Sequence, residues 1–390
     1  MAFKHGITVT EITTGARTLT AVSTAVIGLV AIAGDADAQA FPLDTPVLVT
    51  DLGDAISNAG VDGTLARSLR AIADLVRTPV VVVRVAEGED DAETASNVIG
   101  GDVDGAKTGM QALLAARAQL GVQPKIIGTP GLETQAITTA LAVVAKKLRA
   151  FAYARVVGDT VALATIYRAN FSERELMLIS PDFLVWNTAT SANVTGFAAA
   201  YALGLRALID QEHGPQKTLS NIPVAGVLGL TKDFYWDIED MSSDVGQLNT
   251  AHITGLIRTD AGYRFWGNRT CAPLDDPFQF ESTVRVAQLL SDTIVRGMMW
   301  AIDKPLTPSL AKDIIETING FFRQLKAQGV VLGANAWFDP ALNSTASLKA
   351  GKLRIDYDYT VPPPLEDLGF NQRITDAYFA DFASTLGEAA

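Results

Sequence analysis

Residues 262–270 read GYRFWGNRT and bring three aromatic side chains together with two arginines. The aromatic first half has the composition of a β-strand, and Gly267-Asn268 is typical of a tight turn. The stretch therefore predicts a short strand that runs directly into a turn. Because the same local pattern also fits a structural hairpin in any α/β enzyme, its meaning depends on the sequence on either side.

Composition limits the class of protein. The chain has 390 residues, of which 48% are hydrophobic and 19% charged, as expected of an ordered globular protein with two or three domains. The 31 basic and 43 acidic residues give a net charge of −12, which argues against nucleic acid as a partner. The single cysteine, Cys271, and the three histidines, His5, His213 and His252, form neither a disulfide framework nor a zinc spacing. We therefore expect no metal and no cofactor.

An apolar run at residues 18–33 imitates a signal peptide. Glu11 lies where such a peptide has a basic leader, and several Thr and Ser residues interrupt the run. A membrane-spanning helix needs roughly 20 apolar residues, which this run does not reach. Its Val and Ile content favours a buried strand at residues 22–33, so we expect no direct membrane insertion.

Beyond this run, apolar segments of strand length alternate with segments of helical periodicity. The expected strands are 22–32, 47–50, 80–85, 124–128, 151–157 and 175–180, and the expected helices are 64–77, 108–120, 132–149, 160–170 and 192–211. Such alternation predicts a parallel sheet built from right-handed crossovers. We predict an α/β fold of mixed α+β character: a parallel-sheet α/β core, a C-terminal α+β domain, and extended N- and C-terminal arms.

A sheet of this kind is also an enzyme scaffold. The sequence has no G-x-S-x-G, no G-x-x-x-x-G-K-[ST] and no G-x-G-x-x-G after a strand, so no catalytic residue is assigned. The loop at residues 128–131, GTPG, lies between a strand and a helix, where a helix N-terminus can hold an anion. Alone, it is better explained as a connection without a ligand. Asp182, after the strand at 175–180, is better explained as a cap or turn residue than as a catalytic carboxylate. A Rossmann-like enzyme or nucleotide-binding protein remains the alternative.

The stretch at residues 262–270 resembles a signature of contractile tail sheath proteins. The rest of the chain resembles these proteins as well, essentially from end to end. It is most like the sheaths of temperate enterobacterial myophages of the Peduovirus type and the related R-type pyocins. The stretches that carry the resemblance are HGITVTEI at 5–12, DTPVLVT at 44–50, TGMQAL at 108–113, KLRA at 147–150, GYRFWGNRT at 262–270, WAIDKP at 300–305 and residues 349–359, with YDYTVPPP at 357–364.

The resemblance implies a structural subunit without enzymatic activity. Such subunits stack in rings around an inner tail tube and contract to drive the tube through a bacterial envelope. The implied partners are further copies of the chain, the tail tube protein, and the baseplate and tail terminator proteins. The implied location is the virion, after assembly in the host cytoplasm. We divide the chain into an N-terminal arm (1–20), an N-terminal α/β region (21–95), a central α/β domain (96–260), a C-terminal sheath domain (261–366) and a C-terminal arm (367–390).

Both ends of the chain have apolar residues without a local partner. Residues 6–12 alternate as a strand does but have no neighbouring strand to form a hairpin, and residues 370–386 follow a stiff run of three prolines. The resemblance implies that these arms add strands to a sheet in neighbouring subunits. The candidate arm residues are Ile7, Val9, Ile12, Phe370, Ile374, Tyr378 and Phe379.

A helix is predicted at residues 308–328. Thr307 can cap it, Pro308 suits its first position, and Gly329 suits the position after its end. The residues expected to face the core are Leu310, Ile314, Ile315, Ile318, Phe321, Phe322 and Leu325, and those in a narrow stripe opposite are Lys312, Asn319, Arg323 and Lys326. The stripe fits an ordinary solvated face, and equally the tube-facing helix that the resemblance implies for the C-terminal domain.

Overall fold

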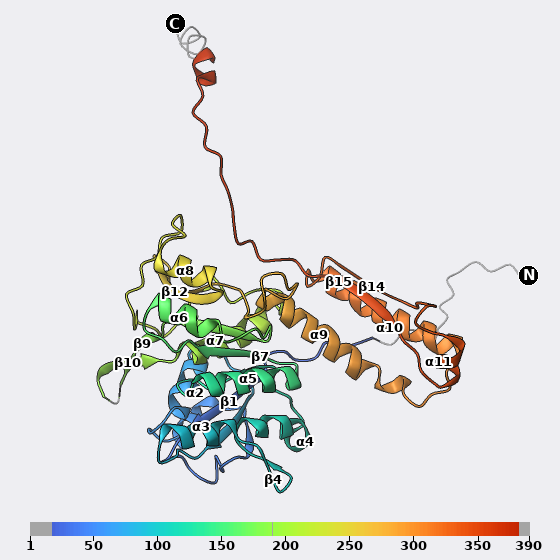
Figure 1. Cartoon of the computed structure of the whole chain (residues 1–390), viewed down its shortest axis with the longest axis horizontal. Coiled ribbons are helices and arrows are strands. Elements are labelled where there is room, and N and C mark those ends of the chain that lie inside the picture. Colours follow the sequence, from blue (N-terminus) through green and yellow to red (C-terminus); the bar gives the residue numbers. More distant parts are fainter. Residues whose placement is uncertain (1–17, 189, 382–390) are drawn as a thin grey trace, which may run out of the picture.

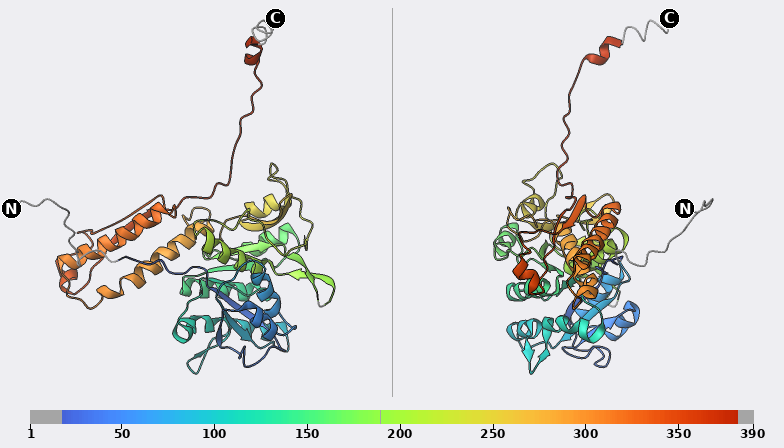
Figure 2. Two further views of the ribbon diagram at one scale, coloured as in Figure 1. Left: turned by 180° about the vertical axis from the view of Figure 1, so that it is seen from behind. Right: turned by 90° about the vertical axis from the view of Figure 1, so that its right-hand side faces the viewer.

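The computed structural model of the chain describes residues 18–188 and 190–381. It has a layered body with a central sheet, and a C-terminal lobe, formed by residues 281–361, that projects from the body (Figure 1). The last described residues run away from both the body and the lobe in every view (Figures 1 and 2).

The body is organised around one eight-stranded sheet with the order β13-β12-β8-β7-β6-β1-β3-β2. The bounds of these strands are β1 Ile27–Ile32, β2 Pro46–Val49, β3 Val80–Val85, β6 Ile126–Gly128, β7 Phe151–Arg155, β8 Leu176–Ser180, β12 Ile253–Thr259 and β13 Gly262–Trp266. The six inner strands are parallel, whereas β2 and β13 are antiparallel edge strands. The predicted parallel-sheet core is therefore confirmed.

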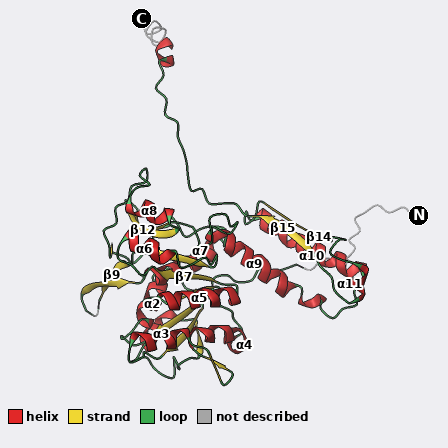
Figure 3. Ribbon diagram, in the orientation of Figure 1, coloured by secondary structure: helices red, strands yellow, loops and turns green. Residues whose placement is uncertain are grey.

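Helices cover both faces of the sheet, as Figure 3 shows. One face packs against α1 (Leu52–Asn58), α2 (Leu65–Ala73) and α7 (Ala198–Glu212). The other packs against α3 (Asp91–Ile99), the 3₁₀ helix η1 (Gly109–Ala115), α4 (Ala116–Leu120), α5 (Gln135–Leu148), α6 (Val161–Arg168) and α8 (Asp244–Thr250). Helices on both faces explain the apolar run Val80–Val83 of β3, a strand that is buried along its whole length, Arg84 included.

Two smaller sheets extend from the body. β9 (Phe183–Asn187) pairs with β10 (Ala192–Gly196) and β11 (Gly229–Leu230), and β4 (Asp102–Val103) pairs with β5 (Ala106–Lys107). The helix predicted at 192–211 is wrong over its first residues, because 192–196 form β10 and the helix begins at Ala198.

The strand predicted at 22–32 is also shorter than expected, since β1 begins only at Ile27. Strands from 21–95 and from 96–260 share the one sheet, so the division proposed near residue 95 does not separate two layered units. The strand predicted within residues 262–270 is confirmed as β13, whose Phe265 is fully buried and pairs with Leu256 of β12.

The C-terminal lobe has its own apolar core between two long helices and a two-stranded sheet. Its elements are α9 (Glu281–Gly297), the 3₁₀ helix η2 (Met299–Ala301), α10 (Pro308–Ala327), β14 (Gly333–Trp337), α11 (Thr345–Lys349) and β15 (Asp356–Thr360), and the 3₁₀ helix η3 (Ala377–Asp381) lies beyond it. The predicted helix at 308–328 is confirmed with its cap, because the Thr307 hydroxyl accepts a hydrogen bond from Leu310 N at 3.2 Å.

The first described residues lie along the lobe rather than in the body's sheet. Leu19 belongs to the core of the lobe and fills the space left by the missing side chain of Gly297, where a Cβ would lie 2.2 Å from Leu19 Cδ2. Val22 N donates to Thr293 Oγ1 at 3.3 Å, and Arg285 donates to Thr24 O at 3.0 Å. The chain therefore passes from the lobe into the body before β1 begins.

Candidate assembly surfaces

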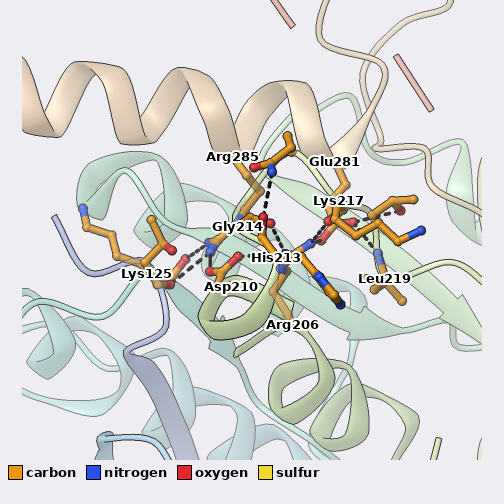
Figure 4. A network of polar contacts seen from close by, with 12 residues as sticks. Lys125, Arg206, Asp210, His213, Gly214, Lys217, Leu219, Glu281 and Arg285 are labelled. Atoms are coloured by element: carbon orange, nitrogen blue, oxygen red, sulfur yellow. Dashed lines mark hydrogen bonds and ion pairs between the residues drawn. The ribbon is translucent and has the colours of Figure 1, made fainter. Parts of the chain in front are cut away.

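A buried network of charged side chains joins the body to α9 (Figure 4). Arg206 of α7 pairs with Glu281, the first residue of α9, at 3.2 Å and with Asp210 at 2.8 Å, and all three side chains are at most 1% exposed. The hydroxyl of Tyr153 on β7 donates to Glu281. A buried charge is tolerated when opposite charges and hydrogen bonds compensate for its lost hydration. The start of α9 is thus fixed to the centre of the body.

The network continues one turn further along α9. Arg285 pairs with Asp210 and donates to the backbone oxygen of Lys125 at 2.6 Å. Lys125 and Arg149 in turn pair with Asp292 of α9. Burial lowers the pKa of Lys125 to about 8, while Asp292 opposes that shift. Body and lobe are therefore joined by ion pairs along more than half of α9.

Sequence reasoning missed this network. The signals for Arg206 are its place inside the apolar run AAAYALGLRALI of α7 and an opposite charge, Asp210, four positions later. Its partner Glu281 lies 75 positions away in the sequence, so no local pattern links the two.

The predicted stripe on α10 is divided by the structure. Lys312, Arg323 and Lys326 are exposed, and Arg323 lies 4.0 Å from Glu316 in a solvated pair. Asn319 does not belong to the exposed stripe. Its side chain donates to Ala336 O at 2.9 Å and accepts from Ala336 N at 2.8 Å, so it fastens β14 to α10. β14 covers α10 at Asn319, which is why this residue is bonded while the three cations are exposed.

The two-stranded sheet of the lobe is a second candidate surface. β14 and β15 pair antiparallel, with Ala336 opposite Tyr357, and the Tyr357 ring lies 5.9 Å from that of Phe322 on α10. Among the described residues, neither strand has a further strand beside it. Sheets of two strands are marginally stable without additional packing, and unpaired edges accept further strands.

The C-terminal arm is the third candidate surface. Its predicted residues Phe370, Ile374, Tyr378 and Phe379 are exposed at 85%, 97%, 82% and 71%. Aromatic and aliphatic side chains this exposed are typical of a segment that is covered by a partner. The N-terminal candidates Ile7, Val9 and Ile12 lie outside the described residues.

The loop at 128–131 has a carboxyl group of its own chain beside it. Gly131 N donates to Glu133 Oε2 at 2.8 Å, and Glu133 is 5% exposed. Burial, with a smaller contribution from the negative charge of Asp182, raises the pKa of Glu133 to about 7. Asp182 accepts from Ala198 N at 2.8 Å and so caps α7, which accounts for a carboxylate at the end of β8.

Cys271, a further candidate for chemistry, is a packed side chain. Cys271 is buried, and its burial raises the pKa of the thiol to about 12. Within residues 18–188 and 190–381, no group of three or more His, Cys, Asp or Glu side chains is placed to hold a metal ion. No helix among these residues has the length and apolar character that a membrane crossing requires.

Known proteins match nearly the whole chain. Residues 105–271 match the phage tail sheath protein central domain, and residues 274–375 match the phage tail sheath C-terminal domain. The chain is 50% identical to the tail sheath protein of Escherichia phage P2, over 98% of each chain. It is 46% identical to the major tail sheath protein of Serratia phage KSP20, over 99% of each.

Solved structures share the fold at low sequence identity. The helical sheath of the anti-feeding prophage in its contracted state superposes with a TM-score of 0.73 at 17% identity, over 94% of this chain and 98% of the other. The sheath of an extracellular contractile injection system, also in its contracted state, superposes with a TM-score of 0.73 at 17% identity. This match covers 97% of this chain and 99% of the other. The two matched domain families and the relatives of 50% and 46% identity show that the chain belongs to the phage tail sheath protein family.

Proposed function

We propose that this chain is the structural subunit of a contractile tail sheath. It polymerises as stacked rings around an inner tail tube and contracts to drive the tube through a bacterial envelope. The observation that carries this proposal is the 50% identity with the phage P2 tail sheath protein over 98% of both chains. The fold shared with two contracted sheaths supports it along nearly the whole chain.

The architecture suits a subunit that moves as a unit while it stays linked to its neighbours. The buried ion pairs of Arg206, Asp210, Glu281 and Arg285 fasten the lobe to the body. We propose that the arms provide the links between copies, by adding strands to the β14–β15 sheet of neighbouring subunits. The exposed apolar side chains of the C-terminal arm support this assignment, because a partner would bury them.

We also propose partners beyond the sheath itself. The family and the solved relatives support self-association and contact with a baseplate, since one similar structure is an anti-feeding prophage baseplate. The tail tube and tail terminator proteins are further partners that we infer from the proposed role. For the tube, the candidate contact is the exposed face of α10 with Lys312, Arg323 and Lys326. The proposed location is the virion, after assembly in the host cytoplasm.

We infer that the chain has no catalytic role. Among the described residues, the amide of the GTPG loop faces Glu133 of the same chain, and no specific observation favours a nucleotide there. Contraction then has to use free energy that is stored during assembly. The extended sheath is therefore metastable, and the contracted sheath is the minimum.

Negative-stain microscopy of the recombinant chain tests this proposal. Without tube or baseplate, we expect hollow cylinders in the contracted form. A small oligomer that binds a nucleotide would favour the enzyme alternative. Cylinders found only in the extended form, or reversal of contraction by ATP, would contradict the stored-energy mechanism.

A further inference from the structure

One side chain of the GYRFWGNRT stretch reaches a residue far along the sequence. Arg269 Nε donates to Glu366 Oε1 at 3.0 Å and Arg269 Nη2 donates to Glu366 Oε2 at 2.7 Å, across a separation of 97 positions. Two parallel bonds between a guanidinium and a carboxylate fix direction as well as distance. The pair thus connects the edge of the body to the beginning of the C-terminal arm.

The body holds Arg269 in place independently of Glu366. Arg269 Nη1 donates to Gln279 Oε1 at 2.8 Å and lies 3.3 Å from His252 Nε2. Its guanidinium carbon also lies 5.4 Å from the centre of the Phe280 ring. A guanidinium already oriented by three neighbours loses little freedom when it binds a carboxylate, so the bond is stronger than one between two free surface chains.

The Arg269–Glu366 ion pair lies where the chain turns from the lobe back to the body. β15 ends at Thr360 in the lobe, a run of three prolines follows, and Glu366 then returns to the body. In the described chain beyond Glu366, residues 367–379 are exposed, and the segment leaves the molecule (Figure 1). Glu366 is therefore the last described residue that an ion pair holds to the body.

We propose that Arg269 and Glu366 form a clamp that sets the point where the C-terminal arm leaves the subunit. With the clamp closed, only residues after 366 span the distance to the next copy. With it open, residues 362–366 join the free segment and lengthen it by up to about 18 Å. This inference rests on the arm function proposed above and assigns to Arg269 the positioning of that arm.

The clamp can be measured in the unassembled full-length chain. Spin labels at Asp275→Cys on the body and Leu368→Cys on the arm, in a Cys271→Ser background, report the distance between the arm's base and the body. Glu366→Ala should broaden the distance distribution about twofold, as expected when a short linker becomes flexible. Asp367→Ala removes the same charge at the adjacent exposed position and should leave the distribution narrow. Equal distributions for Glu366→Ala and the parent chain would overturn the clamp.

Assembly provides a separate measurement. Glu366→Ala should still form cylinders, but with a wider spread of subunit spacing than Asp367→Ala, as measured by electron microscopy. Deletion of residues 367–390 tests the arm itself. If this deletion still assembles normally while Glu366→Ala broadens the label distances, the clamp stands and the arm function is wrong. If the deletion blocks assembly and the label distances do not change, the clamp is wrong and the arm function stands.

Discussion

Asn319 and Ala336 are joined by two hydrogen bonds, in which the side-chain amide of α10 satisfies both backbone polar groups of one residue of β14. Because the N–H and C=O of a strand residue point to the same side, the pair holds β14 against the helix at one point. The two-stranded sheet that we propose as acceptor for neighbouring arms is thereby positioned on α10.

Asn319→Ala should destabilise the lobe by about 1–3 kcal/mol, because it leaves the buried N–H and C=O of Ala336 without partners. The exposed residue Gln324 on the same helix provides the matched control. Gln324→Ala should change the unfolding free energy by less than about 0.5 kcal/mol. Denaturant unfolding of both variants checks the difference, and equal stabilities would show that the two bonds contribute nothing.

Substitution at the junction between body and lobe should lower the unfolding free energy more than Asn319→Ala does. Glu281→Ala removes the shared partner of Arg206 and Tyr153 and leaves a buried positive charge only partly compensated, at a cost of about 3–5 kcal/mol. Glu316→Ala, which removes a carboxylate 64% exposed on α10, should cost under about 1 kcal/mol. A melting temperature for Glu281→Ala within error of that for Glu316→Ala would contradict the structural role of the network.

Glu133 should make stability depend on pH. Its pKa is raised to about 7 in the folded chain from 4.5, so between these values the unfolded state releases a proton that the folded state keeps. The stabilisation is complete below pH 4.5 and is lost as the pH rises to about 7, by about 3 kcal/mol in total. Glu133→Gln keeps an acceptor for Gly131 N and should remove this dependence.

Unfolding free energies at pH 5 and pH 8 test this expectation. Relative to the parent chain, Glu133→Gln should gain stability at the higher pH. Glu87→Gln, at an exposed position on the loop before α3, should have the unfolding free energy of the parent chain at both pH values. If the unfolding free energy of Glu133→Gln changed between pH 5 and pH 8 as much as that of the parent chain, Glu133 would be ionised in the folded state at both pH values.

The parallel sheet could be predicted because its strands carry their own signal. The run VVVVRV predicts a strand covered on both faces, and β3 has those bounds. The strand predicted at 22–32 begins too early, because the residues before β1 pack along α9 and are as apolar as those of a strand. β10 was missed because its pairing with β9 competes with the helical periodicity that continues into α7.

The candidate surfaces were predictable only in part. Helical periodicity gives the angle of a side chain about α10, but it does not tell which neighbouring element lies at that angle. Periodicity therefore groups Asn319 with three cations. In the structure those cations are exposed, whereas the Asn319 side chain bonds to Ala336. Arg206 pairs with Glu281 and Arg269 with Glu366 across 75 and 97 positions, distances over which a single sequence shows no pattern.

The N-terminal arm should be essential for assembly and dispensable for folding. Deletion of residues 1–14 should leave a soluble, folded monomer that does not form cylinders, because it removes the segment that we propose to pair with a neighbouring sheet. Circular dichroism and thermal unfolding should match those of the full chain, which would separate an assembly defect from misfolding. Cylinders formed by the truncated chain would show that this arm is not needed to link subunits.

The exposed cations of α10 should act only in the presence of the tube. Lys312 and Arg323 are exposed, and Arg323 lies 4.0 Å from the solvated carboxylate of Glu316. Exposed charge contacts contribute a few tenths of a kcal/mol each, but repetition around a ring multiplies them. Lys312→Glu combined with Arg323→Glu should therefore preserve folding and tube-free polymerisation and abolish extended sheath on tubes.

Complementation of a phage that lacks its sheath, followed by microscopy of the particles, gives the readout for this double variant. Lys146→Glu with Lys147→Glu makes the same change in net charge at exposed positions of α5, on the body, and should leave extended tails intact. Extended tails of normal length from the α10 variant would refute the tube-facing assignment. Loss of the folded chain in that variant would show instead that the cations stabilise the lobe, which their exposure argues against, since exposed surface substitutions change stability by less than about 0.5 kcal/mol.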